Sequence, residues 1–148
     1  MNSARKSVLV TKVLISILAI AFVVLLFTCV PAAFWYCDTC NKSDFSAKVL
    51  IGVFYLCSPA AIVVIINSLK VLTNLSKEKF FVSENVNHFR HMSNSCLAVV
   101  PVCALACNFF AGFVPITVAA VCMFLILRIV KNVFEYGIEI KEENDLTV

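Results

Sequence analysis

Long apolar runs are the feature that most constrains how this chain can fold. Four of them lie at residues 8–30, 49–72, 96–111 and 113–130; polar segments separate the first three, and a short turn region separates the last two. A helix needs only about 20 residues to cross a hydrocarbon core about 30 Å thick. With 61% hydrophobic and 14% charged residues, the chain is too apolar for a typical soluble domain. The sequence therefore predicts an all-α integral membrane four-helix bundle that forms a single transmembrane domain.

The first two runs are separated by a loop over residues 31–48. Pro31 is expected to end the first helix, because its ring removes a backbone donor and blocks helix continuation. Trp35 and Tyr36 follow it, and such an aromatic pair is typical of a membrane–water interface. A much longer polar connector, residues 73–95, separates the second run from the third.

Within the connector, Ser83 followed by Glu84 predicts a helix start, because both residues are favourable in a first turn. Apolar residues then recur among charged ones, namely Phe80, Phe81, Val86, Phe89 and Met92. This pattern predicts a short amphipathic helix that lies at the membrane surface before the third span. His88 and His91 are expected to be surface residues of that helix.

The last two runs should form a tight hairpin, because the region where they meet, 108–115, contains the turn residues Gly112 and Pro115. Beyond Leu127 the chain becomes charged, and its apolar residues recur at helical spacing, at Ile129, Val133, Tyr136 and Ile140. We therefore expect the fourth helix to continue past the membrane as an amphipathic extension into the tail, residues 131–148.

Basic residues are distributed unevenly along the chain. Ten of the 12 Lys and Arg residues belong to the N-terminal segment, the connector region and the tail region, and only Lys42 and Lys48 lie in the first loop. Cytoplasmic segments are enriched in Lys and Arg. The distribution predicts a multi-pass protein of the cell membrane with both termini and the connector cytoplasmic.

Few residues suggest a catalytic, redox or ligand-binding site. Cys37 and Cys40 form a CxxC pair, a spacing that lowers the pKa of one thiol and allows disulfide exchange. A thiol–disulfide oxidoreductase that uses this pair is therefore one alternative function. We find no motif for a cofactor or a metal, and no cluster of basic residues dense enough for direct nucleic-acid binding.

Two segments carry a resemblance to a known family. Phe81-Val-Ser-Glu-Asn-Val-Asn-His-Phe-Arg90 resembles the connector of the small four-span bacterial membrane proteins catalogued as domain of unknown function 2975. The ending Phe134-Glu-Tyr-Gly-Ile-Glu-Ile-Lys-Glu-Glu-Asn-Asp-Leu-Thr-Val148 is similar to the closing pattern of that family. The resemblance implies a small helix-turn-helix regulator as a partner.

The tail has residues that suit such a partner. Its acidic side chains could meet a basic DNA-binding surface, and two aliphatic residues could anchor the contact; these residues are Glu139, Glu142, Glu143, Asp145, Leu146 and Val148. The sequence thus favours a non-enzymatic membrane protein, in contact with membrane lipid, whose connector and tail bind a soluble partner. Immunity against a membrane-active peptide is a further alternative that rests on size and hydrophobicity alone.

Overall fold

The computed structural model describes residues 3–77 and 79–146, with the side chains of residues 6–77 and 79–144. This part of the chain contains four helices and no strand, which confirms the all-α prediction. The helices are α1 (Ser3–Thr39), α2 (Asp44–Ser76), α3 (Ser83–Ala106) and α4 (Phe113–Leu146). Three of them, α1, α2 and α4, are long and apolar enough to cross a membrane. The predicted third span, 96–111, extends past the end of α3 at Ala106 and stays a prediction.

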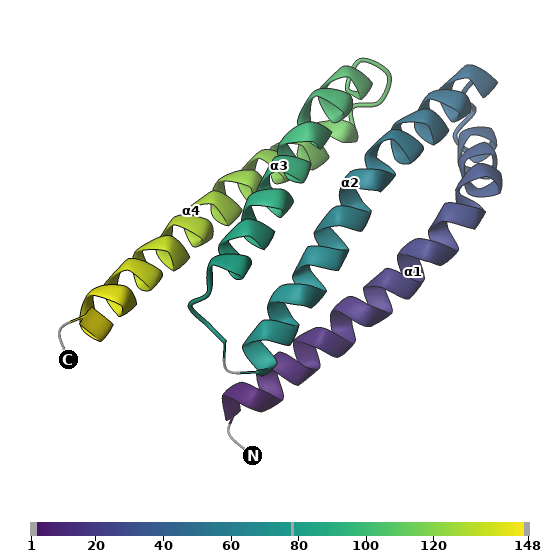
Figure 1. The fold of residues 1–148 in the computed structure, drawn as a ribbon. Coiled ribbons are helices and arrows are strands. Elements are labelled where there is room, and N and C mark those ends of the chain that lie inside the picture. Colours follow the sequence, from purple (N-terminus) through teal and green to yellow (C-terminus); the bar gives the residue numbers. More distant parts are fainter. Residues whose placement is uncertain (1–2, 78, 147–148) are drawn as a thin grey trace.

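The helices lie side by side in chain order and alternate in direction (Figure 1). Within the described residues, the helix backbones approach closely only in the pairs α1–α2, α2–α3 and α3–α4. The four-helix bundle is therefore an open one, in which α1 and α4 form the two edges. Both termini and the α2–α3 connection lie at one end of the molecule, which we name the terminal end. The α1–α2 loop and the α3–α4 turn lie at the opposite end, the loop end.

The prediction that Pro31 ends the first helix is wrong, since α1 continues through it to Thr39. A proline inside a membrane helix is tolerated where neighbouring groups satisfy the backbone nearby. The Tyr55 hydroxyl of α2 donates a hydrogen bond of 2.8 Å to the Leu26 carbonyl, which is next to the Phe27 carbonyl that Pro31 leaves without its intrahelical donor. Figure 1 shows that the last turns of α1 change direction. The first loop is consequently only four residues long, 40–43.

The connector also differs from its prediction. A separate surface helix was expected before the third span, but α3 begins at Ser83 and continues without a break to Ala106. Val86 and Met92, from the predicted surface stripe, are buried. Phe89 packs against Phe134 of α4, with ring centroids 5.0 Å apart. Val86, Phe89 and Met92 therefore pack against neighbouring helices, whereas Phe80 and Phe81 precede α3 and are exposed.

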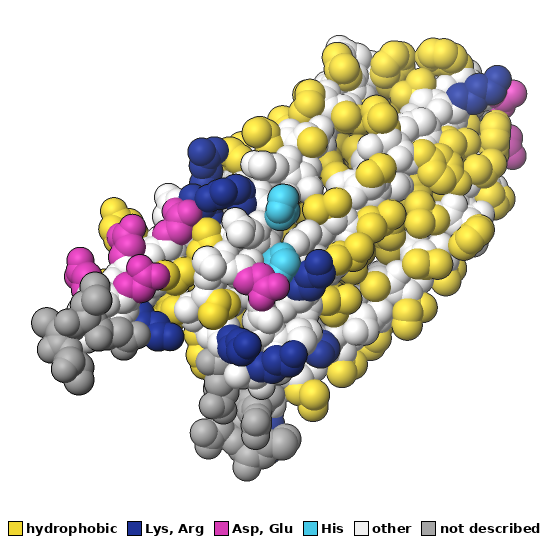
Figure 2. Space-filling view, in the orientation of Figure 1, with side chains coloured by type: hydrophobic (Ala, Val, Ile, Leu, Met, Phe, Trp, Pro, Cys, Tyr) yellow, Lys and Arg dark blue, Asp and Glu magenta, His cyan; other side chains and the backbone are white. Residues whose placement is uncertain are grey.

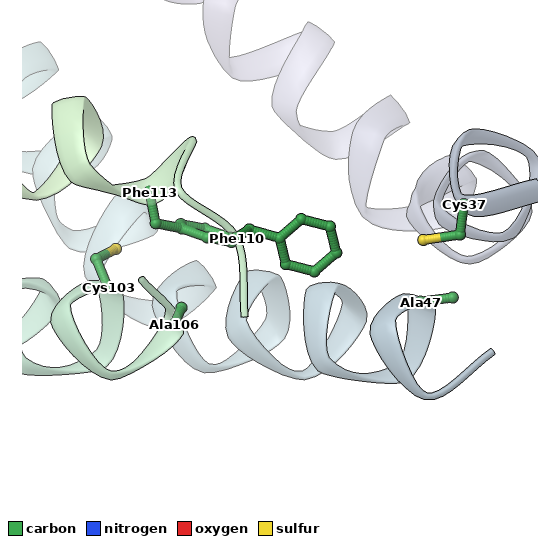
Figure 3. Packing of buried hydrophobic residues seen from close by; sticks show 6 residues of the cluster. All are labelled: Cys37, Ala47, Cys103, Ala106, Phe110 and Phe113. Carbon is green, nitrogen blue, oxygen red and sulfur yellow. The ribbon is translucent and has the colours of Figure 1, made fainter. Parts of the chain in front are cut away.

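A compact hydrophobic cluster joins the four helices at the loop end (Figure 3). Its buried members are Cys37, Ala47, Cys103, Ala106, Phe110 and Phe113. The Lys42 ammonium from the first loop lies 4.1 Å from the centre of the Phe110 ring. This contact ties the α1–α2 loop to the α3–α4 turn, so the two hairpins meet at the loop end as well.

Two glycines provide a test of the packing between the connector and α4. A Cβ atom on Gly137 would overlap the Phe81 ring, whereas one on Gly52 would meet nothing within 4 Å. We expect Gly137→Leu to push Phe81 off α4, at a cost of about 1–3 kcal/mol, and to speed tryptic cleavage at Lys77 and Lys79. Limited proteolysis in detergent measures this rate. Gly52→Leu is the matched control, and equal cleavage of the two variants would contradict the prediction.

Candidate functional site

Polar side chains gather between α2 and α3 at the terminal end. Asn67 and Asn74 of α2 face Asn85 and His88 of α3, and Glu84 joins them from the first turn of α3. We name this set the connector seam. Figure 2 shows the two histidine side chains on one face, beside acidic and basic side chains, while hydrophobic side chains dominate that face toward the loop end. The α3 side of the seam lies where the sequence predicted a surface helix.

Asn85 is the fully buried side chain of the seam. Its amide nitrogen donates to the carbonyls of Lys79 and Phe80, at 3.1 Å and 2.9 Å. Its amide oxygen accepts a hydrogen bond of 2.8 Å from Asn74, whose nitrogen also lies 3.2 Å from the Glu84 carboxylate. One side chain thus satisfies two backbone carbonyls of the turn before α3 and links that turn to α2.

His88 was expected at the surface, and this prediction is wrong, because only 8% of the residue is exposed. The Asn67 amide nitrogen donates to the Val63 carbonyl at 2.7 Å, so the Asn67 oxygen faces His88. The His88 Nδ1 atom lies 2.7 Å from that oxygen and must carry the proton to bond with it. In the neutral ring Nε2 is then an acceptor, and it is buried without a hydrogen-bond partner in the described chain.

The surroundings of His88 disfavour its charged form. Burial lowers the pKa of His88 from its ordinary value, and the nearby positive charge of Lys70 lowers it further. Glu84 opposes these effects by raising the pKa, and His91 adds a smaller lowering. A proton on Nε2 would also be buried without a partner, which is costly. The seam is therefore built around a neutral imidazole.

The seam borders a groove of about 370 Å³ between α2 and α3. Lys70, Thr73, Asn74, Glu84 and His88 contribute its polar lining. Among the described residues, no group of three or more His, Cys, Asp or Glu side chains is placed to hold a metal ion. The arrangement is suited to fixing the register of two helices, because its amides and imidazole bond mainly to one another and to the backbone.

The α4 extension has one packed face and one open face. On the packed face, Phe134 contacts the rings of Phe81 and Phe89, and Glu135 pairs with Arg90 at 3.5 Å and Lys131 at 2.8 Å. The open face carries an apolar row, here named the α4 stripe, whose residues are 58% to 68% exposed. Its members are Ile129, Val133, Tyr136 and Ile140.

The predicted partner-binding residues follow the stripe. Glu139, Glu142 and Glu143 are exposed on the last turns of α4. Asp145 and Leu146 belong to the final turn of the helix, but their side chains lie outside the described part, and Val148 lies outside the described residues altogether. The acidic residues therefore extend the helix that carries the α4 stripe.

The two cysteines of the CxxC pair have different surroundings. Cys37 is 2% exposed and belongs to the loop-end cluster, whereas Cys40 is exposed at the end of α1. Both are free thiols in the structure. The fold thus gives Cys37 packing partners and leaves only Cys40 accessible.

The chain matches a known family over nearly its whole length. The family described as protein of unknown function (DUF2975) matches residues 3–148. The chain belongs to this family. No curated protein and no solved structure matches it. The two segments that resemble the DUF2975 pattern, 81–90 and 134–148, pack against each other in the fold through Phe81, Phe89 and Phe134.

Asn85 offers a direct test of the seam. We expect Asn85→Ala to destabilise the protein by about 2 kcal/mol or more, because Asn74 and two carbonyls lose a buried partner. Unfolding in mixed micelles with increasing sodium dodecyl sulfate measures the change. Asn87→Ala is the control, since Asn87 lies on the same helix and is exposed. Similar losses in both variants would show that the seam does not stabilise the fold.

His88 should make stability depend on pH. Its pKa is lowered in the folded protein, so its contribution is complete above about pH 6.5 and is lost as the pH falls, because the unfolded chain then binds the proton more readily. We expect the wild type to lose more stability than His88→Gln between about pH 7 and pH 5. Thermal unfolding in detergent at several pH values measures this difference. His91→Gln should behave like the wild type, and parallel curves for all three proteins would refute the effect.

Proposed function

We propose that this DUF2975 protein is a multi-pass protein of the cell membrane whose α4 extension binds a soluble cytoplasmic partner. The cytoplasmic side is inferred from the Lys and Arg residues of the N-terminal segment, the connector and the tail. Both termini and the connector share the terminal end of the fold (Figure 1), which is compatible with this orientation. The connector supports the extension through the contacts of Phe81 and Phe89 with Phe134.

The observation that carries the proposal is the exposed α4 stripe. A helix of 34 residues is about 51 Å long, against about 30 Å for the hydrocarbon core. Part of α4 must therefore lie outside the core unless the helix tilts strongly. The stripe begins one residue after Arg128, the first charge on α4, and continues to Ile140. Apolar residues at this spacing are the anchors that a helix uses to dock into a groove of a partner.

The acidic residues at the end of α4 indicate the charge of that partner. Glu139, Glu142 and Glu143 lie beyond or beside the last stripe residue and are exposed. A basic surface would complement them and speed encounter. A small helix-turn-helix regulator has such a surface, and capture at the membrane would keep it from DNA. Asp145, Leu146 and Val148 extend the same segment and are included in the proposed contact.

The test compares proteins captured by the intact protein and by variants in native membranes. After crosslinking, we expect the intact protein to capture a small basic DNA-binding protein, identified by mass spectrometry. Removal of residues 142–148 should reduce this capture at least about tenfold, and Glu139→Lys with Glu142→Lys should act similarly, because charge complementarity is reversed. Val133→Ser with Tyr136→Ser tests the stripe itself.

The control is Asp38→Lys, which reverses the charge of an exposed acidic residue at the loop end. It should leave capture unchanged. Capture of the same soluble protein by the intact and truncated forms would remove the tail from the proposal. Absence of any soluble DNA-binding protein from every sample would overturn the proposed partner.

A further inference from the structure

A second polar feature, independent of the connector seam and of the α4 stripe, lies between α3 and α4. It is a pocket of about 180 Å³ lined only by polar and charged residues, which are Arg90, Ser93 and Asn94 of α3 and Arg128 and Lys131 of α4. We name it the basic pocket. The first and last of these residues, Arg90 and Lys131, are 41 positions apart along the chain, and the antiparallel packing of α3 and α4 brings them together.

Positive charge dominates the basic pocket. Three cationic side chains line it, and one carboxylate, Glu135, contacts two of them, Arg90 at 3.5 Å and Lys131 at 2.8 Å. The Arg128 guanidinium lies over the Phe124 ring, 5.6 Å from its centre. Three positive charges against one negative charge leave an excess of two. Because like charges repel, this arrangement of the exposed Arg90 and Arg128 with the half-buried Lys131 favours a bound anion.

The pocket also lies where the charged part of each helix meets its uncharged part. No Asp, Glu, Lys or Arg occurs from residue 91 to the end of α3, or from the start of α4 to residue 127. Arg90 and Arg128 are the charged residues that adjoin these uncharged segments. In a membrane, basic pockets between helices at this level bind the headgroups of anionic lipids.

The hydrogen-bonding groups of the pocket suit phosphate. An Arg side chain presents a planar fork of N–H donors that matches two phosphate oxygens, and Lys adds a point charge. The exposed Asn94 amide is a further donor. Ser93 is buried and donates to the Phe124 carbonyl at 3.3 Å, which ties α3 to α4 beside the pocket.

We propose that the basic pocket binds a phosphate group, supplied by the headgroup of an anionic phospholipid. The headgroup offsets the excess charge of Arg90, Arg128 and Lys131, and its acyl chains lie along the apolar surfaces of α3 and α4. The bound lipid thereby holds α3 and α4 together at the membrane surface, next to the α4 extension.

The test measures thermal unfolding of the full chain in an uncharged detergent, with phosphatidylglycerol, phosphatidylcholine or inorganic phosphate added. We expect phosphatidylglycerol to raise the unfolding midpoint and phosphatidylcholine to raise it much less. The double variant Arg90→Gln with Arg128→Gln should weaken the apparent affinity for phosphatidylglycerol by about tenfold or more. Lipid adducts retained in native mass spectrometry provide a second readout that does not depend on stability.

Two controls separate binding from folding. Lys77→Gln with Lys79→Gln removes the same number of charges at the terminal end, outside the pocket, and should leave the lipid effect intact. Arg128→Gln alone preserves both ion pairs of Glu135 and should still weaken binding. If inorganic phosphate alone gives the same shift with the same dependence on the variants, the phosphate site stands and the lipid source is overturned. If both double variants respond to phosphatidylglycerol equally, the basic pocket is overturned as a site.

Discussion

The hydrogen bonds between α2 and α3 are the interaction on which the rest of the structure depends. The molecule consists of two hairpins, α1–α2 and α3–α4, and the helix packing that joins them is that of α2 with α3. Apolar surfaces alone do not determine which helices pair, so polar contacts and close packing must specify the pairing. The Asn67–His88 and Asn74–Asn85 bonds supply that specification where the connector meets α2, at about 0.5 to 1.5 kcal/mol each.

The connector seam also determines the direction in which the α4 extension points. Asn85 fixes the turn before α3, and that turn carries Phe81, which packs on Phe134 of α4. A change in the α2–α3 register would therefore move the α4 stripe and the acidic residues beyond it. The two segments with the family pattern, 81–90 and 134–148, share this contact, which gives a physical reason for them to occur together.

The sequence predicted the helices well because long apolar runs leave a chain in lipid few alternatives to helices. It failed at Pro31, where α1 continues and the Tyr55 hydroxyl of α2 bonds the backbone one turn earlier, a contact between two helices that no local pattern could reveal. It also failed for His88, because the same apolar stripe fits a membrane surface and a helix interface equally well. Only the position of Asn67, 21 residues earlier, decides between them. The basic pocket was missed for the same reason, since its residues come from two helices.

The helices lie side by side in the order in which they occur in the chain, and this arrangement has a consequence for biosynthesis. In the described part of the chain, close backbone contacts between helices join only helices that are neighbours in the chain, so every helix after the first meets a partner that has already left the ribosome. Contacts of this local kind form quickly, because little chain entropy is lost in closing short loops. The protein can thus assemble one helix at a time as it enters the bilayer, and the seam between α2 and α3 closes only when the second hairpin has begun to emerge.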